Sequence, residues 1–327
     1  MEMVDEMLNL LVSAGRYSEF VISSRSSSLI GYKEDRSPVT LADFGVQAII
    51  TSWLMKEFGE FSLLAEETLS DCVSNPTMFQ LLLKLLNECG FNFTDTDVME
   101  SFRANKLERE NVKSFWVLDP VDGTKGFLRG GQYAISLGYI EENRVNMGFL
   151  VCPRLKLPKL LGEEVVGCIF YAEVGKGAWV VPMSDIIEKR VNIKVSSCND
   201  FKEARLLRSY ELAHTDKDKN ERFKNILGIS NEVPIDSQVK YGLLACGEGD
   251  LILRFPPVNN PSYREKIWDH AGGVVILEEA GGKVTDLYGN EFEFTPTPYF
   301  SKNIGVFASN GLLHSKGLEV LKEIMGN

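Results

Sequence analysis

Two aspartates three residues apart, Asp119 and Asp122, are the side chains in this sequence best suited to chemistry. They follow an apolar run at residues 115–118, which is typical of a buried strand. Pro120 and Gly123 predict a tight turn directly after that strand. Such a turn can aim both carboxylates at one point, and carboxylates that close repel each other unless a cation lies between them.

Two neighbouring groups add oxygen atoms to this pair. The main-chain carbonyl of Val121 lies between the aspartates, and the hydroxyl of Thr124 follows them. Carboxylates and carbonyls are the ligands that Mg²⁺ prefers. The pattern therefore predicts a magnesium site with Thr124 beside the ion. For D-P-x-D taken alone, an ordinary polar turn after a buried strand is the alternative.

Acids elsewhere in the chain can join such a site. Asp43 lies in the first turn of a buried helix predicted over residues 41–58, where the alternative is a capping-box acid. Glu66 and Glu67 follow a short predicted strand, where solvated surface acids are the alternative. Asp269 opens a predicted helix, where a carboxylate also complements the helix dipole.

A possible phosphate site lies in the second half of the chain. Ser237 and Lys240 are three apart at the start of a helix predicted over residues 237–246, so they share one face. A helix N-terminus with a hydroxyl and an ammonium can hold a phosphate. Arg254 ends the next predicted strand and can add a guanidinium fork. For each cation alone, a solvated surface charge is the alternative.

The segment at residues 114–131, SFWVLDPVDGTKGFLRGG, resembles the signature of the Mg²⁺-dependent, lithium-sensitive phosphatases that include inositol monophosphatase. From Asp119 to Gly131 it looks like the branch of 3'(2'),5'-bisphosphate nucleotidases. Further similar segments are S-P-V-T-x-A-D, ending at Asp43, W-D-x-A-G, with Asp269, and D-S-Q-V-K-Y and L-x-L-R-x-P around the predicted phosphate site.

The resemblance implies a complete metal centre and a water-activating pair. Two or three Mg²⁺ ions are expected, and Li⁺ is expected to inhibit by replacing one of them. Asp43 and Thr124 would orient the attacking water, and Glu67 would support its neighbour. The implied metal ligands are Glu66, Asp119, the Val121 carbonyl, Asp122 and Asp269.

The resemblance also implies a substrate. 3'-Phosphoadenosine 5'-phosphate would be hydrolysed to AMP and phosphate, with the related 5'-phosphosulfate as a second substrate. An inositol phosphate phosphatase of the same fold is the first alternative, and an inactive nucleotide-sensing scaffold is the second. His214 would lie beside the adenine. The implied substrate-contacting residues are Thr124, His214, Ser237, Lys240, Arg254 and Asp269.

The elements that must position these residues fall into two regions. Strand pairs predicted over residues 133–151 and 165–182 indicate a large antiparallel sheet. Alternating helices and strands after residue 195 indicate a smaller α/β unit. We therefore expect domains at 1–194, with most metal ligands, and 195–327, with the nucleotide site and the last metal ligand. The family resemblance implies a layered αβαβα sandwich.

Composition limits the partners of this 327-residue chain. Its formal net charge is −11, which disfavours a nucleic-acid or membrane-surface binder. Six scattered cysteines and three histidines favour neither zinc nor disulfides. The first residues lack a signal-peptide pattern. We expect a monomeric, cytoplasmic protein that acts on a small molecule.

Overall fold

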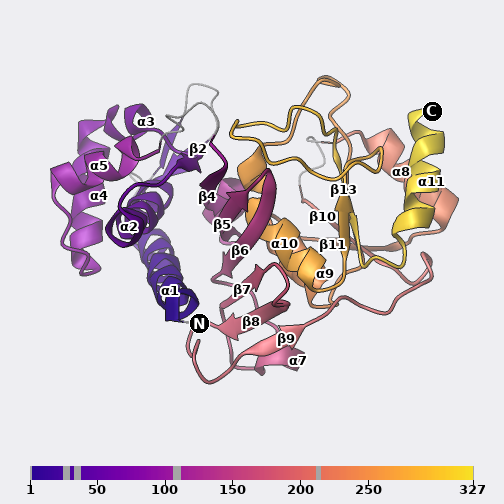
Figure 1. Cartoon of the computed structure of the whole chain (residues 1–327), viewed down its shortest axis with the longest axis horizontal. Helices are drawn as coiled ribbons and strands as arrows, with labels where there is room; N and C mark the ends of the chain where they lie inside the picture. The colour runs from indigo at the N-terminus through magenta and orange to yellow at the C-terminus, as the bar shows by residue number, and fades with distance from the viewer. Residues whose placement is uncertain (1, 25–29, 33–37, 106–111, 211–214, 327) are drawn as a thin grey trace.

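Five alternating layers of helix and sheet make up the protein (Figure 1). The computed structural model describes residues 2–24, 30–32, 38–105, 112–210 and 215–326. Three hydrophobic clusters fill the space between the layers. The predicted αβαβα sandwich is confirmed.

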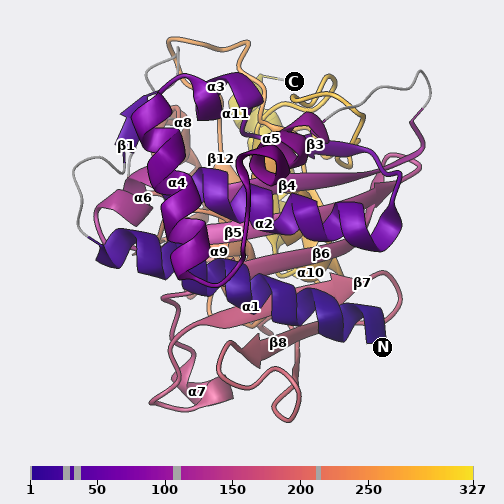
Figure 2. The same ribbon diagram turned by 90° about the vertical axis from the view of Figure 1, so that its left-hand side faces the viewer.

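The first layer consists of helices from the N-terminal third (Figure 2). Thr40 caps α2, which spans Leu41–Phe58 as predicted and is buried over most of its length. The helices of this layer are α1 (Glu2–Ser23), α2, α3 (Leu69–Val73), α4 (Pro76–Glu88) and α5 (Asp95–Arg103), and the short strands β1 (Ile30–Tyr32) and β2 (Pro38–Thr40) lie beside them.

The second layer is a seven-stranded sheet in the order β3-β4-β5-β6-β7-β8-β9. Every pair is antiparallel except β3 and β4, which are parallel. The large antiparallel sheet is therefore confirmed. Its strands are β3 (Leu63–Ala65), β4 (Ser114–Asp122), β5 (Ala134–Glu141), β6 (Arg144–Cys152), β7 (Cys168–Glu173), β8 (Ala178–Pro182) and β9 (Val191–Ile193); α6 (Thr124–Leu128) and α7 (Pro158–Leu161) lie in its connections.

Strand β4 shows why this sheet is covered on both faces. Trp116 and Leu118 join the cluster under α1 and α2, whereas Phe115 and Val117 join the cluster on the opposite face. Successive side chains of a strand point to opposite faces, so an uninterrupted apolar run requires two apolar neighbours. The second neighbour is the middle layer, α9 (Val239–Ala245) and α10 (Ala271–Glu279).

The fourth layer is a mixed five-stranded sheet in the order β11-β10-β12-β14-β13. Strands β10, β11 and β12 run parallel, while β14 is antiparallel to β12 and β13. The fifth layer covers its outer face with α8 (Lys217–Leu227) and α11 (His314–Met325). The strands are β10 (Arg205–Arg208), β11 (Asn231–Pro234), β12 (Leu251–Arg254), β13 (Lys283–Thr285) and β14 (Val306–Ser309).

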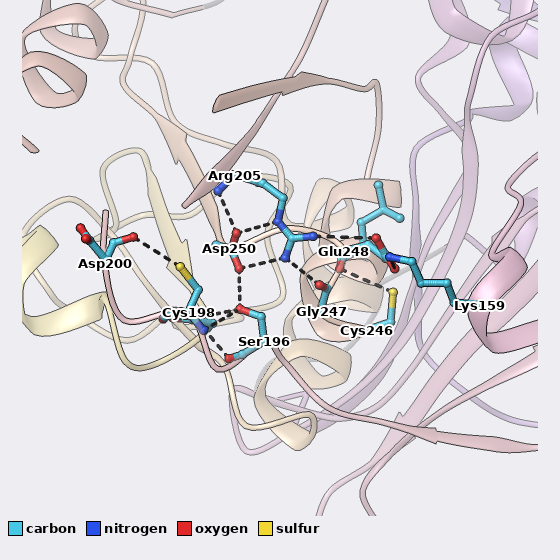
Figure 3. A network of polar contacts seen from close by, with 11 residues as sticks. Lys159, Ser196, Cys198, Asp200, Arg205, Cys246, Gly247, Glu248 and Asp250 are labelled. Atoms are coloured by element: carbon cyan, nitrogen blue, oxygen red, sulfur yellow. Dashed lines mark hydrogen bonds and ion pairs between the residues drawn. The ribbon is translucent and has the colours of Figure 1, made fainter. Parts of the chain in front are cut away.

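A buried polar network fixes the starts of β10 and β12 (Figure 3). Asp250 Oδ2 accepts hydrogen bonds from the backbone N–H and Nε of Arg205, both at 2.8 Å, and Asp250 also bonds Ser196 Oγ. Arg205 donates a further bond to the Gly247 carbonyl at 2.7 Å. Because the two strands are parallel, fixing their starts also fixes their carboxyl ends.

None of the helices in the described ranges combines the length and apolar character that a bilayer span requires.

Candidate active site

The parallel pair β3–β4 brings the first two acids together. Ala65 pairs with Leu118, and the N–H of Glu66 donates to the Leu118 carbonyl at 3.1 Å. Glu66 and Asp119 therefore leave neighbouring strands at the same edge of the sheet. Carboxyl ends of adjacent parallel strands are a common location for ligand sites.

A β-bulge, rather than the predicted tight turn, brings Asp119 and Asp122 together. Strand β4 continues through Asp122, and its register against β5 shifts between the two aspartates. A bulge adds one residue to a strand and bends it, which offsets the alternation of side chains. The expected turn starts only at Gly123, whose φ is 88°. The early turn was a wrong prediction, although the convergence it was meant to explain is present.

Asp269 completes a compact group of carboxylates. It ends the short 3-10 helix η3 (Ile267–Asp269), which contacts β4, and α10 starts two residues later. One oxygen atom from each of Asp119, Asp122 and Asp269 lies within 4.8 Å of the others. The three acids come from distant parts of the sequence, which makes them a candidate metal site.

The electrostatics of this cluster favour a bound cation. Burial raises the pKa of Asp119 well above its ordinary value, and the carboxylates of Glu66 and Asp122 raise it further. Burial likewise raises the pKa of Asp269, with Asp122 adding to the effect. A hard divalent ion bound to these oxygen atoms offsets both the burial of the carboxylates and their mutual repulsion. The residues present therefore fit a magnesium centre.

Glu66 already has a cationic neighbour. Lys266 Nζ lies 3.3 Å from Glu66 Oε1 and 5.3 Å from the centre of the Trp268 ring. The lysine lines the same cleft as the carboxylates. Sequence reasoning missed it because its contact crosses from the second half of the chain to the end of β3.

The end of β4 and the residues directly after it hold the remaining groups predicted for the metal site. Asp119 Oδ1 accepts a hydrogen bond from the Val121 N–H at 3.1 Å. The Val121 carbonyl accepts one from Thr124 Oγ1 at 3.2 Å. A carbon atom added to Gly123 would lie 3.0 Å from the Ser237 Cβ, so only glycine lets these two loops approach.

Asp43 forms the capping box of α2, which was the alternative to a role in the active site. Its Oδ2 accepts hydrogen bonds from the Thr40 N–H at 2.7 Å and from Thr40 Oγ1 at 2.6 Å. Asp43 is buried, and its charge contributes to raising the pKa of Asp119, so it lies close to the acidic cluster. The cap fixes the carboxylate rigidly at a helix start.

The second half of the site lies at the carboxyl ends of the parallel strands β10, β11 and β12. The segments that follow these strands line one cleft together with the acids, and its volume is about 540 Å³. That volume suits a small organic ligand. The lining residues include Glu66, Asp122, Thr124, Ser209, Ser237, Lys240, Arg254 and Asp269.

Ser237 and Lys240 both line the cleft, but not as neighbours on one helix. Ser237 has a φ of 66° and precedes α9, which starts at Val239. The predicted helix start at Ser237 was wrong because a left-handed residue interrupts the helix there. Lys240 Nζ donates to the Ser237 carbonyl at 2.8 Å, and burial lowers the pKa of Lys240 to about 8.

Two of the predicted substrate-contacting residues remain to be placed. Arg254 ends β12 as expected and lines the cleft. His214 lies outside the described residues. Two other cations that line the cleft, Arg208 and Lys224, both pair with Glu232. Arg208 ends β10 and Lys224 lies in the charged helix α8, and neither belongs to a recognisable motif.

Gln238 links the two halves of the site and was missed by sequence reasoning. Its N–H donates to Asp122 Oδ2 at 2.5 Å, and its Nε2 donates to the Trp268 carbonyl at 2.9 Å. Its Oε1 accepts a bond from Ser136 Oγ at 3.0 Å. An uncharged amide gives no signal in sequence, because its importance depends on partners in β4, β5 and η3.

Known proteins resemble this chain over nearly its whole length. A model of the inositol monophosphatase family matches residues 3–325. The 3'(2'),5'-bisphosphate nucleotidase 1 of Arabidopsis thaliana is 38% identical over 288 residues, covering 82% of this chain and 80% of that protein. The 3'(2'),5'-bisphosphate nucleotidase of Dictyostelium discoideum is 34% identical over 300 residues, covering 89% and 87%.

Solved structures share the fold at lower sequence identity. An inositol monophosphatase from Thermotoga maritima superposes with a TM-score of 0.67 at 21% identity, covering 100% of this chain and 99% of that chain. Inositol monophosphatase II from Staphylococcus aureus gives a TM-score of 0.64 at 17% identity, covering 99% and 94%.

Proposed function

Because the chain belongs to the inositol monophosphatase family, we propose that it is a magnesium-dependent 3'(2'),5'-bisphosphate nucleotidase. It hydrolyses the 3'-phosphate of 3'-phosphoadenosine 5'-phosphate, giving AMP and phosphate. The observation that carries this assignment is the convergence of Asp119, Asp122 and Asp269 within 4.8 Å. Two of these acids, Asp122 and Asp269, line one cleft together with Lys240 and Arg254. The family match and the curated relatives confirm the resemblance inferred from the sequence.

The proposed metal centre uses oxygen ligands only. Two or three Mg²⁺ ions would supply a Lewis acid that activates water and offsets charge on the phosphoryl oxygens. Geometry and charge support the three clustered aspartates as ligands, and the edge of the parallel pair β3–β4 supports Glu66. The ligands in this proposal are Glu66, Asp119, the Val121 carbonyl, Asp122 and Asp269. Inhibition by Li⁺ is part of the same proposal.

Asp43 and Thr124 are proposed to orient the attacking water. Asp43 is held by its cap and can accept a proton at its carboxylate. The Thr124 hydroxyl donates to the Val121 carbonyl, so its oxygen lone pairs can accept a hydrogen bond from the water. The two residues fix a nucleophile in line with the phosphate, which is the main requirement for phosphoryl transfer.

Lys240 and Arg254 are proposed to hold the second, non-transferred phosphate with Ser237. Both cations line the cleft that contains the acids, which gives a bisphosphate separate attachment points for its two charged ends. A ligand with one phosphate lacks the second contact and binds more weakly. The same proposal places His214 beside the adenine. It also includes the 5'-phosphosulfate analogue as a second substrate.

The proposal extends to the oligomeric state, the compartment, the partners and the domains of the protein. We propose a monomeric cytoplasmic enzyme with a small-molecule substrate and no nucleic-acid or membrane partner; all six cysteines are free thiols, in keeping with a reducing compartment. We also propose domains at 1–194 and 195–327. The chain passes from the seven-stranded to the five-stranded sheet between β9 and β10, which supports this division.

A substrate panel tests the assignment. Phosphate release is measured from 3'-phosphoadenosine 5'-phosphate, inositol 1-phosphate and inositol 1,4-bisphosphate, with and without Mg²⁺ and at millimolar Li⁺. We expect phosphate release to be fastest from the nucleotide and to require Mg²⁺. Millimolar Li⁺ should slow this release. If the nucleotide is the poorest of the three, the specificity is wrong; if all three are inert with Mg²⁺, the activity is wrong.

A further inference from the structure

A buried glutamate, Glu265, lies behind the cleft next to Arg254. The Glu265 side chain is 2% exposed and that of Arg254 is 33% exposed. Arg254 Nε lies 3.1 Å from Glu265 Oε1, and His270 Nε2 lies 3.6 Å from Glu265 Oε2. A carboxylate is costly to bury unless cations surround it, so this glutamate needs a reason to be there.

The surroundings hold Glu265 in a fixed position. Its main-chain carbonyl accepts a hydrogen bond from the Phe300 N–H at 3.0 Å. His270 is held in turn by Tyr241, whose hydroxyl lies 2.8 Å from Nδ1. The Phe292 and Phe300 rings pack against the imidazole at centroid distances of 5.5 and 5.8 Å. The glutamate is therefore part of a rigid wall behind the residues that line the cleft.

This wall constrains the Arg254 guanidinium. The ion pair uses Nε, and the Tyr263 ring lies 5.8 Å from the guanidinium carbon. A guanidinium held through Nε can present its two terminal nitrogens as a fork to a phosphate. Among the described residues, those that line the cleft include Arg254 and His270 but not Glu265, so the glutamate can act on a ligand only through its neighbours. Of these two, Arg254 carries the permanent charge that a phosphate requires.

Glu265 also balances charge in this part of the cleft. Burial raises its pKa, but Arg254, His270 and Lys240 together bring it below the ordinary value. Arg254 in turn lowers the pKa of Lys240. The two cations therefore repel each other when no anion is bound, and the glutamate offsets that repulsion.

We infer that Glu265 is a positioning residue for the second phosphate, holding the Arg254 fork toward the cleft so that the site selects bisphosphates. The identity of the ligand rests on the proposed function. The placement of the fork rests on contacts within the chain and does not depend on the reaction.

The test compares Glu265→Gln, Glu265→Asp, Arg254→Ala and the Glu265→Gln/Arg254→Ala double variant with the wild type. Adenosine 5'-phosphate binding is measured calorimetrically without metal, so that only the second-phosphate site is probed. Steady-state kinetics with Mg²⁺ then compare 3'-phosphoadenosine 5'-phosphate with adenosine 3'-phosphate, which lacks the 5'-phosphate. Mg²⁺ binding and thermal midpoints monitor the metal centre and the fold.

We expect Glu265→Gln to weaken adenosine 5'-phosphate binding and to raise KM for the bisphosphate about tenfold, as for loss of a charge-assisted contact. The kcat, the rates with adenosine 3'-phosphate and Mg²⁺ affinity should change less than about twofold. Glu265→Asp, which keeps the charge, should restore part of the affinity. In the Arg254→Ala background, Glu265→Gln should have no further effect.

Three results would overturn the inference. Glu265→Gln could bind adenosine 5'-phosphate as the wild type does, or could reduce the rates of both substrates equally, which would indicate a general structural role. A wild type that does not bind adenosine 5'-phosphate would refute the anion site itself. A wild type that binds it but leaves 3'-phosphates intact would refute the proposed reaction, while the role of Glu265 would still stand.

Discussion

Asp119→Asn is the substitution that most clearly separates the effect of the acidic cluster on folding stability from its effect on activity. Asp119 is buried, and one carboxylate oxygen each from Asp122 and Asp269 lies within 4.8 Å of one of its own. At an effective dielectric constant of about 20, two like charges at that distance repel by about 3 kcal/mol. Partial protonation relieves much of this, so we expect the metal-free variant to be more stable by about 1–3 kcal/mol.

The pH dependence of this gain follows from the sign of the pKa shift. Burial and the neighbouring acids raise the pKa of Asp119 in the folded protein. The folded wild type therefore binds more protons than the unfolded chain, and it loses stability as pH rises from about 4, the ordinary carboxyl value. The advantage of asparagine should grow over the same range and reach its full size above the raised pKa.

The assay is urea or thermal unfolding in a chelator at several pH values, followed by titration with Mg²⁺. Wild type should gain stability with Mg²⁺ and the variant much less, because ligands that bind only the folded state stabilise it. Activity of the variant should fall to background. Glu163→Gln, an exposed acid on the surface, is the matched control. A metal-free variant less stable than wild type, or one that retains full activity, would refute the reasoning.

Three further substitutions test other parts of the account. Gly123→Ala should cost about 1–3 kcal/mol and most activity, because its Cβ would press on Ser237, whereas Gly130→Ala, also at positive φ but in open space, should keep activity. Lys240→Arg should abolish the loss of adenosine 5'-phosphate affinity that wild type shows as pH rises through about 8, where Lys240 deprotonates. Asp250→Asn should cost about 2 kcal/mol at neutral pH and flatten the acid limb of the stability curve.

The acid limb in the last case follows from linkage. Burial raises the pKa of Asp250, but hydrogen bonds from Arg205 and Ser196 bring it below the ordinary value. Its contribution is therefore present above the unfolded pKa and is lost as pH falls through the folded one. Equal losses for both glycine variants, an unchanged pH profile in Lys240→Arg, or an unchanged acid limb in Asp250→Asn would contradict the respective arguments.

Local signals in the sequence were enough to predict many of the elements. The helix at Leu41–Phe58 has a capping threonine before it and Gly59 after it, so both of its ends are encoded within a few residues. The strand pairs of the large sheet have mostly apolar runs separated by short polar turns. By contrast, α8 was not predicted because charged side chains dominate its sequence. The helix α11 was also not predicted, although its buried residues follow the helical spacing of one face.

Site residues that belong to a local sequence motif could be predicted. Site residues whose role depends on contacts with distant parts of the chain could not. Asp119, Asp122 and Asp269 carried recognisable patterns, and the structure brings them together. The bulge between the first two depends on pairing with β5, which no local pattern reveals. Gln238 and Glu265 have their partners on other elements, so their importance becomes visible only in three dimensions.

The most direct test of the central claim is a crystal structure of the protein soaked in Mn²⁺, a stand-in for Mg²⁺ that is visible by anomalous scattering. We predict strong anomalous peaks bound by Asp119, Asp122 and Asp269, with Glu66 as a further ligand, at about the 2.1 Å typical of such oxygen ligands. Saturating Mn²⁺ that leaves these carboxylates without a peak, or that binds only elsewhere on the protein, would contradict the account.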